Sequence, residues 1–279
     1  MKKIAINILT AILLMVMCVG CGGGSGGSRS ANITMTTEEG GRVSFYLSGS
    51  GVATVDWGDG SERVSLTLNE DEVRFEHTYP SATMRTILIN GDNITGLRGS
   101  NIRLTSLDVS RNTALTSLMS VQGQFTSLDV SRNTALTRLD VGGTQLTSLD
   151  VSNNTALTIL IVSNAQLASL DVSRNTSLTE LYIIGTQLTN LDVSRNTALT
   201  VLYILGTQLT SLDVSNNTAL DGLRVENNQL TASALNALFE SLPPRLGRNP
   251  WIIITNEPGA GQANRSIAEA KGWLVSVSW

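Results

Sequence analysis

The sequence has few aromatic and charged side chains and is almost without cysteine and histidine. Aromatic residues make up 4% of the 279 positions and charged residues 15%, with two cysteines and one histidine. Both cysteines, Cys18 and Cys21, lie near the N-terminus, so the rest of the chain is expected to hold no disulfide and no Cys-ligated metal. The formal net charge is −4 and no basic stripe is present. This balance argues against nucleic acid as a partner.

The first residues have the pattern of an export signal. Lys2 and Lys3 precede an apolar run, residues 4–19, that is too short for a confident membrane-spanning helix. The segment Cys18-Val19-Gly20-Cys21 resembles the lipobox of bacterial lipoproteins. The resemblance implies cleavage before Cys21 and lipid attached to its sulfur, so that residues 1–20 are a signal peptide. An ordinary secretory signal followed by a free cysteine is the alternative.

The predicted mature chain begins with a flexible tether. Residues 21–30 are the modified cysteine followed by glycine, serine and one arginine, without an apolar side chain to bury. The lipid implies a membrane anchor at the bacterial outer membrane or cell surface. No other cofactor is expected.

Residues 31–93 show short alternating stretches that predict a small antiparallel β-sandwich. The expected strands are 42–47, 53–57, 64–68, 73–77 and 83–89. The motif Trp57-Gly58-Asp59-Gly60 and the later His77-Thr78-Tyr79 resemble the WGDG and H-x-Y motifs of the PKD-type β-sandwich family. That resemblance implies a spacer or contact module, in which His77 packs and forms hydrogen bonds.

From residue 94 to residue 230 the chain repeats with a period of 21 residues. The motif Leu-Asp-Val begins at Leu107, Leu128, Leu149, Leu170, Leu191 and Leu212. Such regularity predicts a solenoid of about seven coils. The phrase LxxLxV followed by Asn or Thr resembles the leucine-rich-repeat family, and most closely the 21-residue repeats of bacterial surface proteins.

Each coil has apolar residues at positions 1, 4, 6, 11, 14 and 16, counted from Leu115 and its equivalents, and these are expected to point inward. An asparagine at position 19 is expected to hydrogen-bond the backbone of neighbouring coils. Position 9, where the family prefers Asn, holds Gly123 and then mostly Thr, so the bend after the first half of the coil is not explained. The aspartates at position 15 are expected to accept local hydrogen bonds rather than bind calcium.

Residues 231–279 break the repeat and predict a cap. The expected elements are a helix N-capped by Ser233 and ending near Leu242, a strand at 251–255, a helix at 264–271 and a strand at 273–279. The fold expected for the whole chain is therefore mainly β with short helices: a small β-sandwich, a leucine-rich-repeat solenoid and an α/β C-terminal cap.

The first half of the coil is predicted to be the binding surface. Its strand positions 3, 5 and 7 point outward and vary between coils, while the second half hardly changes. An apolar patch with a charged rim is typical of protein-contact surfaces. The predicted ligand-binding residues are Ile159, Ile161, Tyr182, Ile184, Val201, Tyr203 and Leu205 in the patch and Arg138, Asp140 and Arg224 at its rim.

We expect no catalytic residues and no metal site. No Ser-His-Asp set or phosphate-binding glycine loop is present, and the best carboxylate pair, Asp140 and Glu180, has no evident sugar subsite. The expected function is that of a cell-surface lipoprotein that binds a protein partner through the strand face. A glycan-binding accessory lipoprotein and a structural spacer without a defined ligand remain as alternatives.

Overall fold

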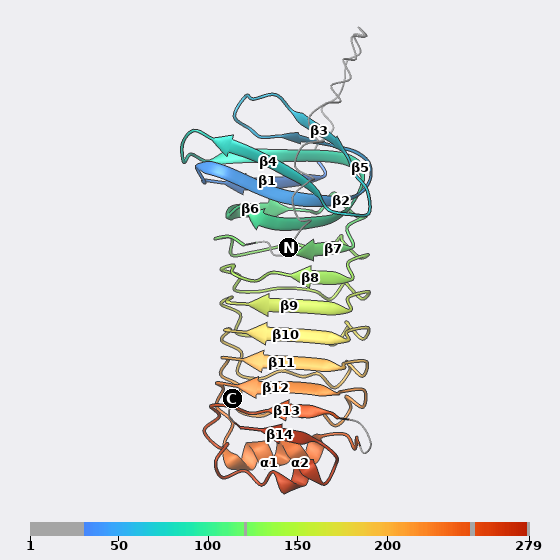
Figure 1. The fold of residues 1–279 in the computed structure, drawn as a ribbon, viewed down its shortest axis with the longest axis vertical. Coiled ribbons are helices and arrows are strands. Elements are labelled where there is room, and N and C mark those ends of the chain that lie inside the picture. The colour runs from blue at the N-terminus through green and yellow to red at the C-terminus, as the bar shows by residue number, and fades with distance from the viewer. Residues whose placement is uncertain (1–30, 120–121, 246–248, 278–279) are drawn as a thin grey trace, which may run out of the picture. The chain divides into compact units, whose positions relative to one another are not determined.

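The computed structural model describes residues 31–119, 122–245 and 249–277, so the predicted signal peptide, Cys21 and the tether lie outside the described residues. The described strands form one 14-stranded arrangement, antiparallel near the N-terminus and parallel along the coils (Figure 1). None of the helices described is long and apolar enough to cross a membrane. The predicted fold class, mainly β with short helices, is confirmed.

In chain order the elements are β1 (Ile33–Thr37), β2 (Gly41–Asp56), β3 (Val64–Thr67), β4 (Val73–Tyr79), β5 (Arg85–Asn101), β6 (Leu104–Asp108), β7 (Ser117–Met119), β8 (Arg138–Asp140), β9 (Ile159–Ser163), β10 (Glu180–Ile184), β11 (Val201–Leu205), β12 (Gly222–Glu226), α1 (Ala232–Ser241), β13 (Trp251–Ile253), α2 (Ser266–Glu269) and β14 (Leu274–Ser276).

The N-terminal sandwich is built around the two long strands β2 and β5. β2 pairs antiparallel with β3, β4 and β5, and β1 pairs antiparallel with β5 and β6. The stretches 42–47 and 53–57, predicted as separate strands, belong almost entirely to the single strand β2. Gly49 and Gly51 between them have positive φ, and the register with β5 shifts there, so the strand bends without leaving the ladder.

The WGDG and H-x-Y motifs meet at one corner of this sandwich. Trp57 is fully buried, and the Tyr79 hydroxyl donates a hydrogen bond to its carbonyl over 2.7 Å. The His77 ring stacks on the Trp57 indole at 5.0 Å, and its Nε2 lies 2.7 Å from an Asp59 carboxylate oxygen. Gly58, with φ of 74°, makes the turn that brings Asp59 there. His77 therefore packs and forms a hydrogen bond, as the sequence predicts.

The long strand β5 connects the sandwich to the first coil. Its residues 85–89 pair with β1, and its residues 96–98 pair in parallel with β7. The boundary predicted between residues 93 and 94 lies within this strand. The sheet thus passes from antiparallel to parallel pairing without a linker.

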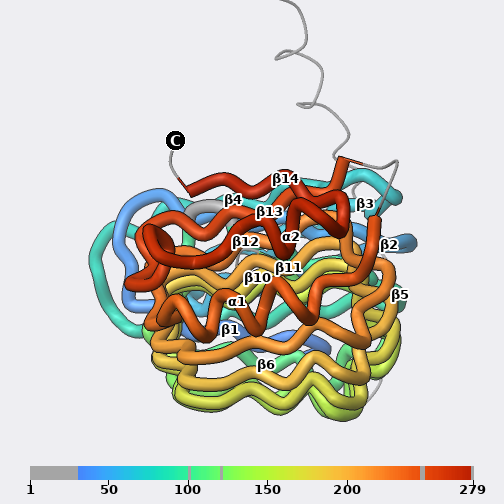
Figure 2. The backbone as a smooth tube through the Cα atoms, turned by 90° about the horizontal axis from the view of Figure 1, so that it is seen from below, coloured from blue at the N-terminus to red at the C-terminus, as the bar shows by residue number. Residues whose placement is uncertain are grey.

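The coils bury the apolar positions that the repeat predicts. In the coil that begins at Leu178, the six inward side chains are at most 9% exposed; they are Leu178, Leu181, Ile183, Leu188, Leu191 and Val193. Viewed along the stack, successive coils lie over one another (Figure 2). Burying a leucine or valine side chain contributes roughly 1.5–3 kcal/mol relative to exposing it, so the stacked coils share one continuous core.

Buried asparagines connect each coil to the coil before it. The Asn175 side-chain amide donates to the carbonyls of Val151 and Asn154, each over 2.9 Å, and Asn175 itself is fully buried. The same pair of bonds recurs at Asn133, Asn154, Asn196 and Asn217. The predicted structural role of position 19 is confirmed. We call this column the asparagine ladder.

The bend after the first half of the coil is made by position 8 rather than position 9. Position 8 has φ between 51° and 70° in five consecutive coils, where the residues are Gly143, Asn164, Gly185, Gly206 and Asn227. Glycine and asparagine are the residues that most readily adopt this left-handed conformation. The sequence signal for the bend was therefore present one position earlier than the family pattern suggests.

The aspartates of position 15 stabilise their own turns. Asp150 accepts a hydrogen bond from the Ser152 backbone N–H over 2.9 Å, and five other coils repeat this contact. Hydrogen bonds from Ser152 hold the pKa of the Asp150 carboxyl below its usual value. Within the described ranges no group of three or more His, Cys, Asp or Glu side chains is arranged to hold a metal ion.

The cap continues the parallel sheet and covers the last coil with two helices. β13 pairs with β12, and β14 with β13. Helix α1 is N-capped by Thr231, whose side chain accepts from the Ala234 N–H, so the predicted N-cap Ser233 lies inside the helix. Glu257, 5% exposed, accepts hydrogen bonds from the backbone of Asn228 and Leu230 and so fixes the cap to the last coil.

Candidate binding face

The outward side chains of the parallel strands form two straight columns. Strand register places Arg138, Ile159, Glu180, Val201, Gly222, Trp251 and Leu274 in the first column, and Asp140, Ile161, Tyr182, Tyr203, Arg224, Ile253 and Ser276 in the second. Adjacent members are one strand spacing apart, about 4.8 Å. We call this surface, the outward side chains of β8 to β14, the strand face.

All ten predicted ligand-binding residues lie on the strand face and are half-buried. β9, β10 and β11 share the same alternation of half-buried outward residues and fully buried inward ones. We expected the patch to point into solvent, but each side chain is flanked by neighbours from the strands on either side. Ile184 and Leu205 continue the apolar surface toward the ends of β10 and β11.

Three aromatic rings follow one another along this face. The ring centroids of Tyr182 and Tyr203 are 4.9 Å apart at an interplanar angle of 75°, and those of Tyr203 and Trp251 are 5.8 Å apart at 73°. Each ring thus presents an edge to the face of the next, the arrangement that the aromatic quadrupole favours. We call these residues the aromatic row. The two tyrosines belong to the patch predicted from the sequence, whereas Trp251 was not assigned to it.

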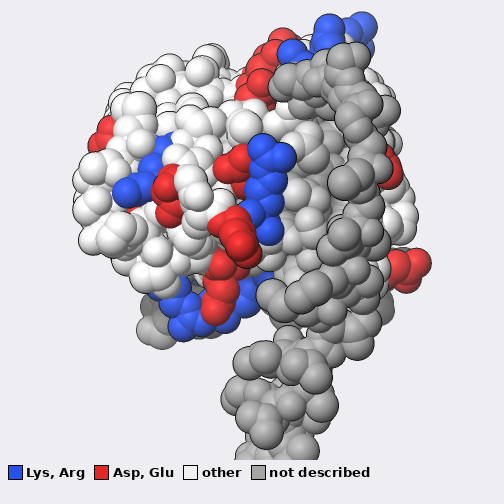
Figure 3. Space-filling view, turned by 90° about the horizontal axis from the view of Figure 1, so that it is seen from above, with Lys and Arg blue, Asp and Glu red and all other residues white. Residues whose placement is uncertain are grey.

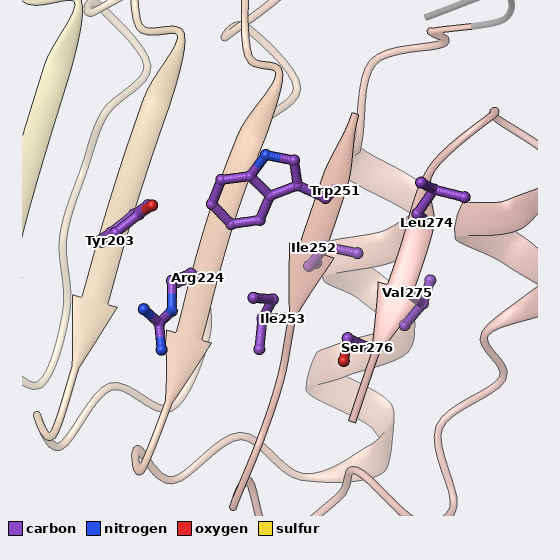
Figure 4. A pocket seen from close by; sticks show the side chains of 8 residues that line it. All are labelled: Tyr203, Arg224, Trp251, Ile252, Ile253, Leu274, Val275 and Ser276. Carbon is purple, nitrogen blue, oxygen red and sulfur yellow. The ribbon is translucent and has the colours of Figure 1, made fainter. Parts of the chain in front are cut away.

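A glycine in the first column allows Trp251 to reach the tyrosines. Gly222 precedes Trp251 in the column, and a Cβ placed on it would lie 2.6 Å from an indole carbon of Trp251. Real atoms do not approach so closely, so the indole occupies the space that a side chain at 222 would fill. Figure 4 shows the ring extending from β13 across β12.

A cavity of about 430 Å³ lies beside the end of the aromatic row. Leu274 on β14 is 60% exposed, which makes it one of the few large apolar side chains open to solvent among the described residues. Figure 4 shows these side chains around the opening. The lining residues are Tyr203, Arg224, Trp251, Ile252, Ile253, Leu274, Val275 and Ser276. The volume lies in the range of small-ligand pockets, which are roughly 300–1,000 Å³.

Most polar groups of the strand face are already paired. The Tyr182 hydroxyl donates to a Glu180 carboxylate oxygen over 2.7 Å; burial and then this bond raise the pKa of Tyr182. Arg224 pairs with Glu226 and lies over the Tyr203 ring, its guanidinium carbon 5.4 Å from the ring centre. The Arg224–Glu226 pair thus lies at the rim, whereas the Glu180 carboxylate lies within the patch, between Ile159 and Val201, and is paired with Tyr182.

Arg138 is different from these rim residues. Its Nε is buried and has no hydrogen-bond acceptor among the described residues. Asp140 on the same strand accepts from the Gly142 N–H over 3.1 Å and so is held by its own turn. Within the strand face Arg138 thus lies on the first strand, β8, and the cavity lies at the last strands, β13 and β14; the register column itself continues beyond β8 to Ser117 on β7.

The cap residues of this site were missed from the sequence. The stretch 251–255 was correctly predicted as a strand, but its parallel pairing with β12 could not be known without tertiary contacts. Trp251, Ile253 and Leu274 therefore were not assigned to the strand face. The one available signal was Gly222, a gap in a column otherwise filled by side chains.

The sandwich end of the chain offers a different surface. Where described residues are visible in Figure 3, acidic and basic side chains alternate and form no extended patch of one sign. The Arg42 and Arg74 guanidinium groups both pair with Glu76, and Arg98 pairs with Glu72 and covers the Tyr46 ring. Because these opposite charges pair with each other, the electrostatic potential that they produce outside the sandwich is too weak to attract a charged partner strongly.

The fold and this face define a leucine-rich-repeat solenoid. The functional domain of InlJ from Listeria monocytogenes, described as including a cysteine ladder, matches 63% of this chain at 33% identity and a TM-score of 0.53. The Leptospira interrogans leucine-rich-repeat protein LIC12759 matches 63% at 19% identity and a TM-score of 0.52. The internalin InlF from Listeria monocytogenes matches 66% at 20% identity and a TM-score of 0.48.

These matches cover 42%, 46% and 54% of the respective solved chains, so the present chain spans about half of each. No family model and no curated protein matches the sequence. The similarity to the InlJ domain and the Leptospira protein supports the leucine-rich-repeat solenoid. Both cysteines of this chain lie before the repeats, at positions 18 and 21, so its coils contain no cysteine ladder. Instead, the side chains of the asparagine ladder bond one coil to the next.

Proposed function

We propose that this chain is a non-catalytic recognition module of the bacterial cell surface, which binds a protein partner through the strand face. The observation that carries the proposal is the aromatic row, set in half-buried aliphatic side chains and bordered by paired charges. A few residues dominate the binding free energy of protein interfaces, and tyrosine, tryptophan and arginine are enriched among them. The solved leucine-rich-repeat structures that it resembles supply the matching architecture.

The ring geometry favours a protein over a glycan. The rings of the aromatic row are turned by 73–75° to one another, so they do not form the shared flat platform on which a sugar chain could lie. The aliphatic surroundings, such as Ile161 and Val201, also offer few hydrogen-bonding groups to hydroxyls. A spacer without a ligand would need neither the aromatic row nor the cavity.

The lipid anchor completes this proposal. Cys21 follows Gly20 and precedes the glycine-serine segment, a sequence that supports lipid attachment and free orientation of the folded part. The sandwich, with its PKD-like motifs, then holds the coils away from the membrane. Outer-membrane or cell-surface location follows from this reasoning.

Affinity capture with two matched variants tests the binding face. The purified chain, coupled to a resin, would capture partners from bacterial and host extracts for identification by mass spectrometry, and affinities would then be measured with the purified partner. The double substitution Tyr182→Ala with Tyr203→Ala should weaken binding about thirtyfold, because truncating interface aromatics commonly costs about 2 kcal/mol or more.

The control is Ser148→Ala with Ser211→Ala, two exposed serines in the second half of the coil. It should leave affinity unchanged at equal thermal stability. Equal loss in both double variants, or loss only in the serine control, would show that the wrong half of the coil was chosen.

Metabolic labelling with a fatty-acid analogue tests the anchor separately. The unchanged chain should take up label and move into the membrane fraction, whereas Cys21→Ser should do neither. Cys18→Ser should still be labelled, since that cysteine lies within the predicted signal peptide. Equal labelling of the chain and its Cys21→Ser variant would refute lipidation at this residue.

A further inference from the structure

The two ends of the strand face differ in chemistry. At β8, the Arg138 guanidinium has a buried Nε for which the described residues provide no acceptor. At β13 and β14, the cavity is lined mainly by Trp251, Ile253 and Leu274 together with Tyr203. Between them the first column passes through Ile159, the Tyr182-paired Glu180 and Val201.

We infer that the strand face binds an extended segment of its protein partner in one orientation, with a large apolar side chain in the cavity at Trp251 and Leu274 and one carboxylate on Arg138. This inference rests on the proposed function and adds the chemistry and direction of the partner. A carboxylate is the group that complements an unpaired guanidinium, since it can accept two parallel hydrogen bonds.

The spacing of the two contacts follows from the sheet register. Arg138 and Trp251 share the first column and are five strands apart, through Ile159, Glu180, Val201 and Gly222. At about 4.8 Å per strand the separation is roughly 24 Å. An extended chain advances about 3.3–3.6 Å per residue, so the acidic and apolar residues should be about seven positions apart.

The cavity requires a second group from the partner, an apolar side chain, in addition to the carboxylate bound by Arg138. Most of its lining side chains are apolar or aromatic, and the one charged group among them, the Arg224 guanidinium, already pairs with Glu226. An inserted aromatic or leucine side chain would cover Leu274, which is 60% exposed. Tyr182, together with Tyr203 at the edge of the cavity, then lies beneath the middle of the segment, where small or apolar residues fit best.

Selection of random peptides of about 15 residues, twice the expected spacing, tests this inference with the full chain as the target. Enriched phage-displayed peptides should carry an Asp or Glu and a Trp, Phe or Leu about seven positions apart. A synthetic copy of the best peptide should lose about tenfold or more in affinity for Arg138→Gln, because hydrogen bonds to charged groups contribute about 1.5–3 kcal/mol. It should lose a similar factor for Leu274→Asp.

Matched controls separate binding from folding. Arg111→Gln changes an exposed arginine in the second half of a coil, and Val52→Asp changes a 52% exposed aliphatic residue of the sandwich. Neither should alter peptide affinity. Leu274→Asp is preferred to Trp251→Ala because the Leu274 side chain is already open to solvent. Replacing Leu274 should therefore leave the packing of the cap intact.

The alternative outcomes have different meanings. Enriched peptides without acidic residues, or affinity unchanged by Arg138→Gln, would overturn the inferred chemistry while leaving the strand face as the binding surface. Peptides whose affinity is also unaffected by the Tyr182 and Tyr203 double variant would overturn the proposed function itself. If the chain instead forms concentration-dependent dimers that Leu274→Asp disrupts, the occupant is a second copy and the inference fails.

Discussion

In each coil the strand half, positions 1–8, and the turn half, positions 9–21, both bury their inward apolar side chains but use their polar side chains differently. In the turn half Asn175 and Asp150, like their equivalents, bond to backbone groups of a neighbouring coil or of their own turn. In the strand half the outward residues, such as Glu180 and Tyr182, bond mainly to each other. The turn half is therefore constrained to repeat in its polar as well as its apolar positions, whereas the outward positions of the strand half are free to encode recognition.

The largest effect expected from this comparison is at the asparagine ladder. Asn175→Leu should lower the free energy of unfolding by about 2–4 kcal/mol, because two buried carbonyls lose their donor. Urea denaturation followed by circular dichroism would measure it. Asn216→Leu, at an exposed position directly before the ladder residue Asn217, should stay within about 0.5 kcal/mol of the unchanged chain. Similar midpoints for both variants would mean that the ladder does not hold the coils together.

A smaller effect is expected at the bend between the two halves. Gly206 has φ of 62°, and no steric contact closer than 3.7 Å awaits a Cβ there. Gly206→Ala should therefore cost about 1–2 kcal/mol from backbone conformation alone. Gly206→Asn should cost less, because Asn164 and Asn227 already occupy the same position of other coils. Thermal unfolding of the two variants measures both losses of stability. If the two losses are equal, the left-handed backbone at position 206 is not the cause of the destabilisation.

The smallest effect concerns acid stability of the turn half. The pKa of Asp150 is lowered by its hydrogen bonds with Ser152, so the stabilisation is present above the unfolded-state pKa of about 3.9 and is lost as the pH falls through the folded-state value. Asp150→Asn should therefore be slightly less stable than the unchanged chain at neutral pH and equal to it in strong acid. Urea midpoints across that range measure the difference. If the stability of Asp150→Asn depends on pH as strongly as that of the unchanged chain, ionisation of Asp150 does not contribute to acid stability.

The sequence predicts the repeated parts of this molecule better than its joins. A period of 21 residues and the apolar positions within it were enough to place the core and the outward residues of β9 to β11. Each coil contacts only its neighbours, so the same packing recurs in every repeat. The N-cap moved from Ser233 to Thr231, and two expected strands merged into β2, because both outcomes depend on neighbours distant in sequence.

The candidate site divides in the same way. Tyr182 and Tyr203 share one column because they are one period apart, and the sequence shows this directly. Trp251 lies outside the repeat, and its approach to Tyr203 depends on parallel pairing of β13 and on the absent side chain of Gly222. The exposure of Leu274 likewise depends on where β14 ends the sheet.

The continuous strand β5 has a mechanical consequence. Because its first residues pair with β1 and its later residues with β7, a pull applied to the sandwich reaches the first coil through covalent backbone rather than through a hinge. The strands lie across the axis along which the coils stack (Figure 1), so such a load acts across the strands, in the direction of the ladder hydrogen bonds between β5 and its neighbours. The stack beyond is held coil to coil by the asparagine ladder and strand pairing. Tension along the stack therefore finds no hinge at the junction, and the pairing between successive strands and coils carries the load.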